Sequence, residues 1–410
     1  MRVLVYPHDL AIGGSQLNAI DLASQIGELG HDAVVYGIPG PLAARVEEKG
    51  IPFFAAHPMQ YRPAPSRIWQ LARLVRRERI DLIHAYEWPP CLDAFYGAHL
   101  VGGVPLVCTV LSMSVSPLVP RSVPLIMGTP QLGAQAEAQQ GGLVSVVEPP
   151  IDVEHDHPRN DGSAFRRQHS IGVDDLLVVT VSRLSIELKL DALSEAIDAA
   201  GRLADRYPMH LLVVGDGPAA PQLQTRAELV NERAGRSVVR LVGPMLDPRP
   251  AYAAADVVVG MGSSALRGMA HAKPVVVQGE LGFSEVFDRT SAPMFLWQGM
   301  YGVGTGGRSG EVLASQMVGL LDSHDHRRRV GDFGLGVVRE RYSLQAAASS
   351  LVDIYGQAAA RQARAPVTAD ALRVGVRALG AEVRAHRPCE KRARRNDEAM
   401  RLQAAACPRR

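Results

Sequence analysis

Short apolar runs alternate with amphipathic stretches along residues 1–110 of the chain. Each run has the length of a buried strand, and each stretch between two runs carries apolar residues at helical spacing. The first stretch, residues 15–29, has Leu17, Ile20 and Ala23 on one face and stops at Gly30. This order predicts a parallel, doubly wound sheet with helices on both faces. The predicted strands are residues 2–6, 33–36, 51–55, 81–85 and 106–110, and the predicted helices are residues 15–29, 42–49 and 66–78.

A second alternating series follows a polar stretch, residues 152–175, which has the composition of a linker. Its predicted strands are residues 176–181, 210–214, 238–242, 257–259 and 274–277. A further helix is expected over residues 344–360. The pattern therefore predicts an α/β protein of two Rossmann-like domains, with a ligand cleft between them.

Charge is distributed unevenly along the chain. Residues 361–410 hold 13 Lys+Arg against 5 Asp+Glu, whereas the preceding 360 residues hold 31 against 37. No apolar run is long enough for a transmembrane helix, and the first residues do not resemble a signal peptide. We therefore expect a cytoplasmic protein with a basic tail. Cys91 and Cys108 lie in apolar segments and are expected to be reduced core thiols.

Two cations follow the apolar run 176–181, namely Arg183 and Lys189. Ligands of α/β sheets bind at the carboxyl ends of the strands, so the pair is well placed to hold an anion with two phosphates. Gly13, Gly14 and Ser15 form a second candidate anion site, because Ser15 is expected to cap the first helix and helix amino termini favour anions.

Other glycine turns follow strands of the second series. Gly215 and Gly217 are interpreted as a plain turn. Gly260, Gly262 and Ala265 match the dinucleotide fingerprint G-x-G-x-x-A, with Glu280 in the region where a ribose-binding acid belongs. An NAD(P)-dependent oxidoreductase is therefore one alternative function.

Three polar residues, His84, Tyr86 and Glu87, come at or just after the end of the strand predicted over 81–85. That end of the strand faces the expected crevice, where these residues would contact an acceptor. The sequence leaves this interpretation and simple packing equally open.

The order of these segments resembles the retaining glycosyltransferases of family 4, which have the GT-B fold. The resemblance covers about residues 1–360 and is carried by several segments: GGSQLNAIDLASQIGELGHDAVVYG, DLIHAYEW, EPPID, SRLSIELKLDALSEAI, VVGDGP, AYAAADVVV and HDHRRRVGDFGLGVVRERYSLQAAASSLVDIYGQA. It implies an acceptor domain over 1–155, a donor domain over 156–342 and a last helix, 343–360, that packs back on the first domain.

The resemblance also implies an activity, namely metal-independent transfer of a sugar from a nucleotide-diphosphate sugar, with retention and without a further cofactor. Arg183 and Lys189 would stabilise the leaving diphosphate. The amides of Gly14, Gly262, Ser263 and Ser264 would assist, and Gly243 and Pro244 would border the base. The acceptor would be a small molecule, a glycan or a lipid-linked compound, and no nucleic acid is expected as a partner.

The chain departs from the family pattern at several positions. The two glutamates of the E-x7-E element are replaced by Val259 and Arg267, and Arg267 is expected to face the ribose or a phosphate. Leu111 and Tyr86 stand where the family often has histidines. A catalytically inactive homologue that acts as a partner or regulator is therefore the second alternative.

The basic tail contains one helical pattern. Leu372, Val376, Leu379 and Val383 recur on one helical face with arginines beside them. Such a face would suit peripheral contact with the anionic inner face of a membrane. Gly375 and Gly380 interrupt the pattern and no aromatic residue anchors it, so the sequence favours a disordered, solvated tail over residues 361–410.

Overall fold

The computed structural model describes residues 1–57, 64–112, 114–140, 142–187, 189–306, 310–361 and 367–385. The chain forms two compact units. Unit 1 comprises Met1–Met127, Gln135–Ser145 and the chain from Leu351 onward, and unit 2 comprises Gly128–Ala134 and Val146–Ser350. The continuous part of unit 2 therefore begins at Val146, before residue 156, which is where the sequence predicts the start of the second domain.

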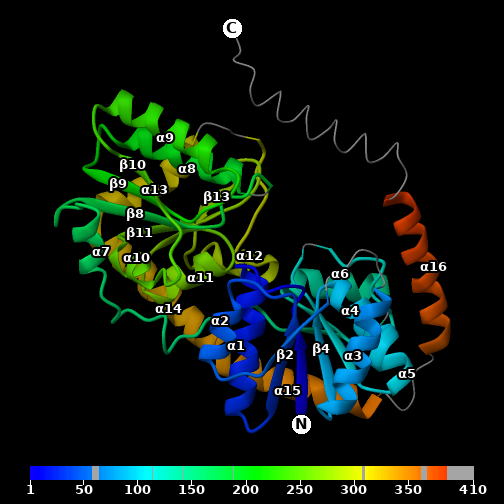
Figure 1. Ribbon diagram of the computed structural model, residues 1–410. Coiled ribbons are helices and arrows are strands. Elements are labelled where there is room, and N and C mark those ends of the chain that lie inside the picture. Colours follow the sequence, from blue (N-terminus) through cyan, green and yellow to red (C-terminus); the bar gives the residue numbers. More distant parts are fainter. Residues whose placement is uncertain are drawn as a thin grey trace. The chain divides into compact units, whose positions relative to one another are not determined.

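Unit 1 contains a seven-stranded sheet in the order β3-β2-β1-β4-β5-β6-β7 (Figure 1), and the pairings from β3 through β6 are parallel. The five strands expected from the apolar runs are confirmed, and β6 and β7 are additional. The strands are β1 (Arg2–Tyr6), β2 (Asp32–Gly37), β3 (Phe53–Ala55), β4 (Leu82–Tyr86), β5 (Leu106–Val110), β6 (Leu125–Met127) and β7 (Val144–Val146).

Unit 2 contains a six-stranded sheet in the order β10-β9-β8-β11-β12-β13. All its pairings are parallel except the pairing of β12 with the short edge strand β13, which is antiparallel. The strands are β8 (Leu176–Val181), β9 (Met209–Val214), β10 (Val239–Gly243), β11 (Val257–Gly260), β12 (Val275–Gln278) and β13 (Ser284–Val286).

The helices connect the strands and cover both faces of each sheet. Those up to β7 are α1 (Gly14–Glu28), α2 (Ala43–Glu48), α3 (Pro65–Arg77), α4 (Trp88–Ala94), the π-helical turn η1 (Phe95–His99), α5 (Leu100–Gly102) and α6 (Pro130–Gln140). Those of unit 2 are α7 (Ser163–Gln168), α8 (Leu190–Leu203), α9 (Ala220–Ala234), α10 (Arg249–Ala254), α11 (Ser263–Ala270), α12 (Ala292–Gln298), α13 (Glu311–Asp322) and α14 (His324–Arg341). Two more follow, α15 (Leu344–Arg361) and α16 (Val367–Ala385).

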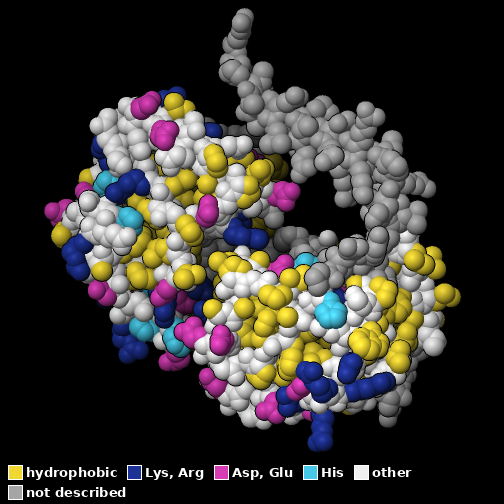
Figure 2. Space-filling model, in the orientation of Figure 1, with side chains coloured by type: hydrophobic (Ala, Val, Ile, Leu, Met, Phe, Trp, Pro, Cys, Tyr) yellow, Lys and Arg dark blue, Asp and Glu magenta, His cyan; other side chains and the backbone are white. Residues whose placement is uncertain are grey.

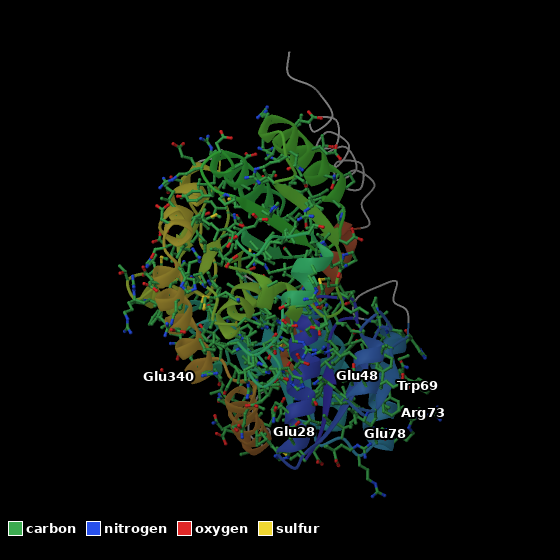
Figure 3. The ribbon with its side chains drawn as sticks, turned by 90° about the vertical axis from the view of Figure 1, so that its left-hand side faces the viewer. Glu28, Glu48, Trp69, Arg73, Glu78 and Glu340 are labelled. Carbon is green, nitrogen blue, oxygen red and sulfur yellow. The ribbon has the colours of Figure 1, made fainter. Side chains whose placement is uncertain are left out.

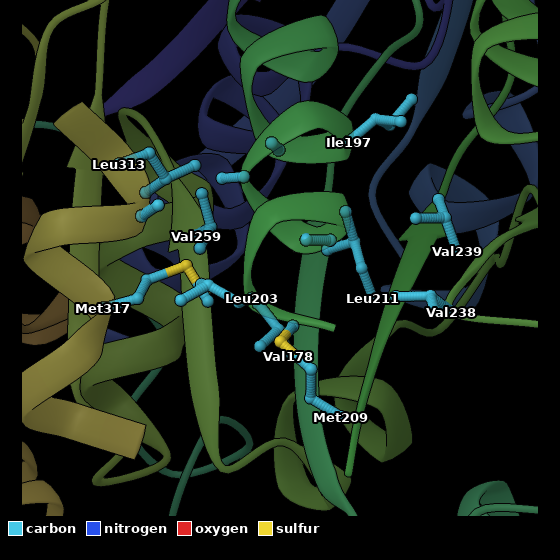
Figure 4. Close-up of a cluster of buried hydrophobic side chains, with 14 of the residues drawn as sticks. Val178, Ile197, Leu203, Met209, Leu211, Val238, Val239, Val259, Leu313 and Met317 are labelled. Atoms are coloured by element: carbon cyan, nitrogen blue, oxygen red, sulfur yellow. The ribbon is translucent and has the colours of Figure 1, made fainter. Parts of the chain in front are cut away.

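The apolar strands of unit 2 supply two separate cores, one on each face of the sheet. Successive side chains of a strand point to opposite faces. Val178 of β8 accordingly packs with α8, α9 and α13 (Figure 4), whereas Leu177 and Val179 pack with helices on the other face. This burial on both faces explains why the strands read as continuous apolar runs rather than as alternating ones.

The outer face of α3 is basic. Trp69 and Arg73 project from it (Figure 3), and the guanidinium of Arg73 lies 5.5 Å from the centre of the Trp69 ring. On the inner face, Arg67 is fully buried and lies 3.8 Å from the carboxylate of Asp93, which also accepts a hydrogen bond from Tyr6. A buried arginine needs such a counter-charge, so this pair fixes α3 against β1 and α4.

A buried polar network joins α15 to the sheet of unit 1. One ring nitrogen of His84 lies 2.7 Å from the hydroxyl of Tyr355, and the other lies 2.6 Å from Oγ1 of Thr109. Burial lowers the pKa of His84 to about 3, so the ring is neutral, with one nitrogen donating and the other accepting. His84 thus ties α15 to β4 and β5.

The segment after α15 contains a helix where the sequence favoured disorder. α16 spans Val367–Ala385, and its Val374 and Ala378 are buried against Leu92 of α4. The expectation of a disordered tail is therefore wrong for this segment, because tertiary contacts compensate for the low helix propensity of Gly375 and Gly380. Residues 386–410 lie outside the described residues. Within the described part of the chain, no helix has both the length and the apolar character needed to cross a membrane.

The His84 network predicts a pH-dependent stability. His84→Ala should lower the free energy of unfolding by about 2–5 kcal/mol, because two buried hydroxyls lose their partner. In the wild type the unfolded chain takes up a proton on His84 below its ordinary pKa of about 6.5, and the folded chain does not. Stability should therefore fall as the pH drops from about 6.5 toward 3, and the variant should show a shallower decline.

Urea unfolding followed by circular dichroism at several pH values measures both effects. His324→Ala is the matched control, since the His324 side chain is 80% exposed. Parallel pH profiles for the wild type and His84→Ala would show that the network does not carry the acid sensitivity.

Candidate functional site: a cationic pocket at the carboxyl edge of unit 2

The candidate site of unit 2 lies where the strand order reverses. The chain proceeds from β8 outward to β9 and β10, and then returns to β11 on the other side of β8. The carboxyl ends of β8 and β11 therefore diverge, and open α/β sheets bind ligands at such a point. A cavity opens there, and its lining residues are Thr180, Val181, Ser182, Lys189, Ala192, Leu193, Gly260, Met261 and Gln278.

The two cations predicted from the sequence are brought together at this cavity. Lys189 lines it, at the start of α8, and Arg183 lies exposed on the loop before it. Burial and the nearby charge of Arg183 lower the pKa of Lys189 to about 8. Neither residue forms an ion pair with an acidic side chain among the residues that the structure describes. The pocket thus holds two adjacent positive charges that an anion would stabilise.

Backbone hydrogen bonds, rather than acidic side chains, hold the loop that carries Arg183. The N–H of Leu184 donates to the carbonyl of Asp216 at 2.9 Å, and the N–H of Ala219 donates to the carbonyl of Leu184 at 2.8 Å. Because neutral groups make these contacts, the loop is fixed without neutralising its charge.

Gly215 and Gly217 allow this close approach. Both have positive φ, a Cβ on Gly215 would collide with the carbonyl oxygen of Ser182, and a Cβ on Gly217 would lie 2.5 Å from that of Leu184. From the sequence, these glycines are interpreted as a plain turn. The tertiary structure shows that both glycines pack against the loop that carries Arg183. Two glycines directly after a strand could have indicated such a close approach of another backbone segment.

The turn between β11 and α11 forms another wall of the site. Gly262 precedes the helix with a φ of 57°, and its N–H donates to the carbonyl of Met300 at 2.7 Å. The first intrahelical bond joins the N–H of Leu266 to Gly262, so the amides of Ser263 and Ser264 lie ahead of it. The hydroxyl of Ser264 accepts a hydrogen bond from Tyr252 at 3.1 Å. Amides in the first turn of a helix have no partner within the helix and favour anions.

Gly243 and Pro244 follow at the end of β10. Gly243 has a φ of 80° with open space around it, and its carbonyl accepts a hydrogen bond from Gly215. Pro244 is exposed. These two residues and the cationic loop therefore lie at one edge of the sheet, as expected of strands that run parallel.

Arg267 has an acidic partner inside unit 2. Its guanidinium forms an ion pair with Asp156 at 3.7 Å, and Asp156 is 3% exposed. The ion pair gives Arg267 a structural contact in unit 2, and the expectation that Arg267 faces the ribose or a phosphate stays a prediction. Val259, the other replaced glutamate position, is fully buried in the core beside α8 and α13, where a carboxylate would be costly.

The glycine loop of unit 1 begins α1 one residue earlier than predicted. Gly13 is the capping residue and Gly14 opens the helix, and no side chain caps it. Ser15 is therefore in the first turn and does not cap. A Cβ on Gly13 would meet only the terminal amide of the flexible Gln16 side chain, which could move aside.

His84 and Tyr86 are interior residues of unit 1, with 1% and 2% exposure. Because both side chains are buried, they pack in the interior of unit 1 and do not face an acceptor.

Glu87 differs from His84 and Tyr86. Its φ is 68°, which is costly for a residue with a side chain, and its carboxylate accepts hydrogen bonds from the amides of Leu111 and Ser112 and from the Ser112 hydroxyl. Glu87 thus fixes the loop that follows β5.

Comparisons with known proteins agree with this architecture. Residues 12–121 match the model of "Glycosyltransferase Family 4", and residues 175–299 match that of "Glycosyl transferases group 1". The D-inositol 3-phosphate glycosyltransferase of Corynebacterium glutamicum (strain R) is 28% identical over 238 residues, which cover 53% of each chain. The match thus spans about half the length of this relative.

Solved structures share the fold over most of this chain. A glycosyltransferase from Rickettsia africae has a TM-score of 0.71 at 12% identity, and the match covers 87% of this chain and 98% of that one. HepE of Anabaena, in complex with UDP, has a TM-score of 0.67 at 20% identity and covers 87% and 100%. The chain therefore has the GT-B fold, as the resemblance implied, and two of its segments match family models of glycosyltransferases. These matches favour neither alternative function.

The packing of the glycines predicts that Gly217→Ala loosens the cationic loop. The added Cβ would meet the carbonyl of Leu184, so the amides of Leu184 and Ala219 should exchange with deuterium at least about tenfold faster. Hydrogen-exchange mass spectrometry of the peptides that contain them measures this. Gly235→Ala is the control, since Gly235 also has positive φ but nothing lies within 4 Å of its Cβ position. Unchanged exchange in Gly217→Ala would contradict the role given to this glycine.

Proposed function

We propose that this protein transfers a sugar from a nucleotide-diphosphate sugar to an acceptor. The observation that carries the proposal is the pair Arg183 and Lys189, two adjacent cations without an acidic partner among the described residues, beside a cavity at the strand-order switch. Keeping such a pair is unfavourable unless an anion binds, and a diphosphate carries charge at both of its phosphates.

The chemistry of transfer needs this arrangement. When the bond between the anomeric carbon and the donor oxygen breaks, negative charge develops on the β-phosphate. Fixed cations and backbone amides in a partly desolvated site stabilise that charge without reorganising. Arg183 and Lys189 would supply the cations, and the amides of Ser263 and Ser264 at the start of α11 would add hydrogen bonds. The sugar then passes to a hydroxyl of the acceptor, whose proton must be removed.

The comparisons support particular choices of donor. HepE of Anabaena has been solved with UDP-glucose, and the Corynebacterium relative is named for a D-inositol 3-phosphate acceptor. We take a UDP-hexose as the first donor to test, and a small molecule, a glycan or a lipid-linked compound as the acceptor class. Retention at the anomeric carbon and independence of metal ions follow the family resemblance.

Each remaining candidate residue takes a role that fits its place. Gly243 and Pro244, at the end of β10, would border the base. Gly13, Gly14 and Ser15 would contribute amides from α1, as the resemblance implies. Glu87 is the candidate on the acceptor side, because it shapes the loop after β5 at the carboxyl edge of unit 1.

The cationic pair predicts a selective loss of affinity. Arg183→Ala and Lys189→Ala should each weaken UDP binding by about 1.5–3 kcal/mol, which is the range for a hydrogen bond to a charged group. Binding of uridine, which lacks the phosphates, should hardly change. Isothermal titration calorimetry of both ligands measures the difference, and Arg202→Ala on the same helix, α8, is a control for general charge. Equal losses for UDP and uridine would overturn the assignment.

The pH dependence separates a cationic contact from a merely structural one. Lys189 has a pKa of about 8 in the free protein, and a bound diphosphate favours its protonated form. UDP affinity should therefore fall as the pH rises through 8 toward 9.5, with proton uptake on binding near pH 8. The affinity of Lys189→Ala should be nearly flat over the same range. A flat profile in the wild type would show that Lys189 does not meet the phosphates.

Metal independence predicts that turnover survives chelation. With UDP-hexose and an acceptor screen, release of UDP should be the same with EDTA as with Mg²⁺, because Arg183 and Lys189 take the place of the ion. Activity that EDTA abolishes and Mg²⁺ restores would contradict this part of the proposal. UDP binding without turnover of any donor would instead support the inactive homologue.

A further inference from the structure

The last described helix, α16, is docked on unit 1 by specific contacts. The buried carboxylate of Asp370 accepts hydrogen bonds from the amide and hydroxyl of Ser122 at 2.8 and 2.9 Å. Tyr96 donates to the carbonyl of Ala371 at 2.6 Å, and Val374 packs with Leu92. The orientation of the helix is therefore fixed, and so is the face that it turns to solvent.

The outward face of α16 is apolar. Leu372, Val376 and Leu379 are 73%, 64% and 66% exposed, and their spacing of four and three residues places them in one line. Figure 2 shows hydrophobic side chains along the right-hand edge of the molecule, where Figure 1 places α16. We call these three residues the α16 stripe. The helix has already buried Val374 and Ala378 on unit 1, so the stripe is not needed for docking to its own chain.

The positive charge around the α16 stripe indicates what kind of surface it binds. Arg377 is exposed beside it, and residues 361–410 carry 13 Lys+Arg against 5 Asp+Glu. A second copy of the chain would bring two such basic segments together, which is electrostatically unfavourable. An anionic lipid surface attracts each basic residue near it and accepts apolar side chains at the depth of the headgroups.

We propose that α16 docks this protein on an anionic lipid bilayer, with the α16 stripe inserted at the interface and Arg377 against the headgroups. The helix lies on the membrane and does not cross it. It also lies outside both family matches, which end at residues 121 and 299. Docking does not depend on sugar transfer, so it is tested without donor or acceptor.

The test is co-sedimentation of the full chain with vesicles. Wild type should bind vesicles of equal parts phosphatidylglycerol and phosphatidylcholine at least about tenfold more strongly than pure phosphatidylcholine at low salt. The triple variant Leu372→Gln, Val376→Gln, Leu379→Gln should lose about tenfold or more of that binding, because the apolar insertion is removed.

A matched triple variant controls for surface hydrophobicity in general. Val173→Gln, Leu229→Gln and Leu246→Gln change residues of unit 2 that are 97%, 48% and 92% exposed, and should leave vesicle binding unchanged. Thermal melting checks that all variants fold. Leu379→Trp gives an independent readout that needs no loss of function, since its tryptophan emission should shift to the blue on anionic vesicles relative to that of the wild type.

Several results would overturn the proposal. Wild type that stays in the supernatant with anionic vesicles at low salt would do so, as would equal binding of the two triple variants. An absent blue shift in Leu379→Trp would exclude insertion of the stripe. If light scattering shows a dimer that the stripe variant converts to a monomer, while neither protein binds vesicles, the stripe is an interface between copies of the chain.

Discussion

The candidate site depends on keeping two positive charges close together without an acidic partner. Burial and the charge of Arg183 both disfavour the protonated form of Lys189, which is why its pKa falls to about 8. The fold accepts this cost because the loop around Arg183 is held by backbone donors and acceptors of Asp216 and Ala219. An anion bound beside the two cations would relieve their repulsion and favour the protonated form of Lys189.

The same constraint accounts for the placement of the residues that replace the family's glutamates. Val259 is part of the hydrophobic core of unit 2, and Arg267 has its own counter-charge in Asp156. Among the described residues that line the cavity, no carboxylate competes with an anionic ligand for Arg183 and Lys189. The described lining of the cavity thus combines the cation Lys189 with neutral polar side chains such as Thr180, Ser182 and Gln278.

Unit 1 uses buried polar groups for a different purpose. The ring of His84 is neutral and satisfied on both sides, so it fixes α15 against β4 and β5 rather than carrying out chemistry. Glu87, three positions after His84, is only half-buried and orders the loop after β5. Ser122, farther along the same connection, receives α16 through Asp370. The carboxyl edge of this sheet is therefore shaped by the last helices of the chain.

The sequence by itself determined the central strands of both sheets, the bounds of α1, α2, α3 and α15 and the cationic pair, because apolar periodicity and residue order along a βα unit are local properties. Only the tertiary structure decided which polar residues are interior. His84 meets Tyr355 from 271 positions away, Arg267 meets Asp156, and Gly217 meets the loop of Leu184. The tertiary structure also decided that α16 forms and that Leu372 faces outward. The sequence has apolar residues on the face of Leu372 as well as on the face of Val374 and Ala378, and the structure buries the second face. Whether a polar residue is buried, and which face of a helix is exposed, depends on contacts between residues far apart in the sequence. Local sequence patterns do not show these contacts.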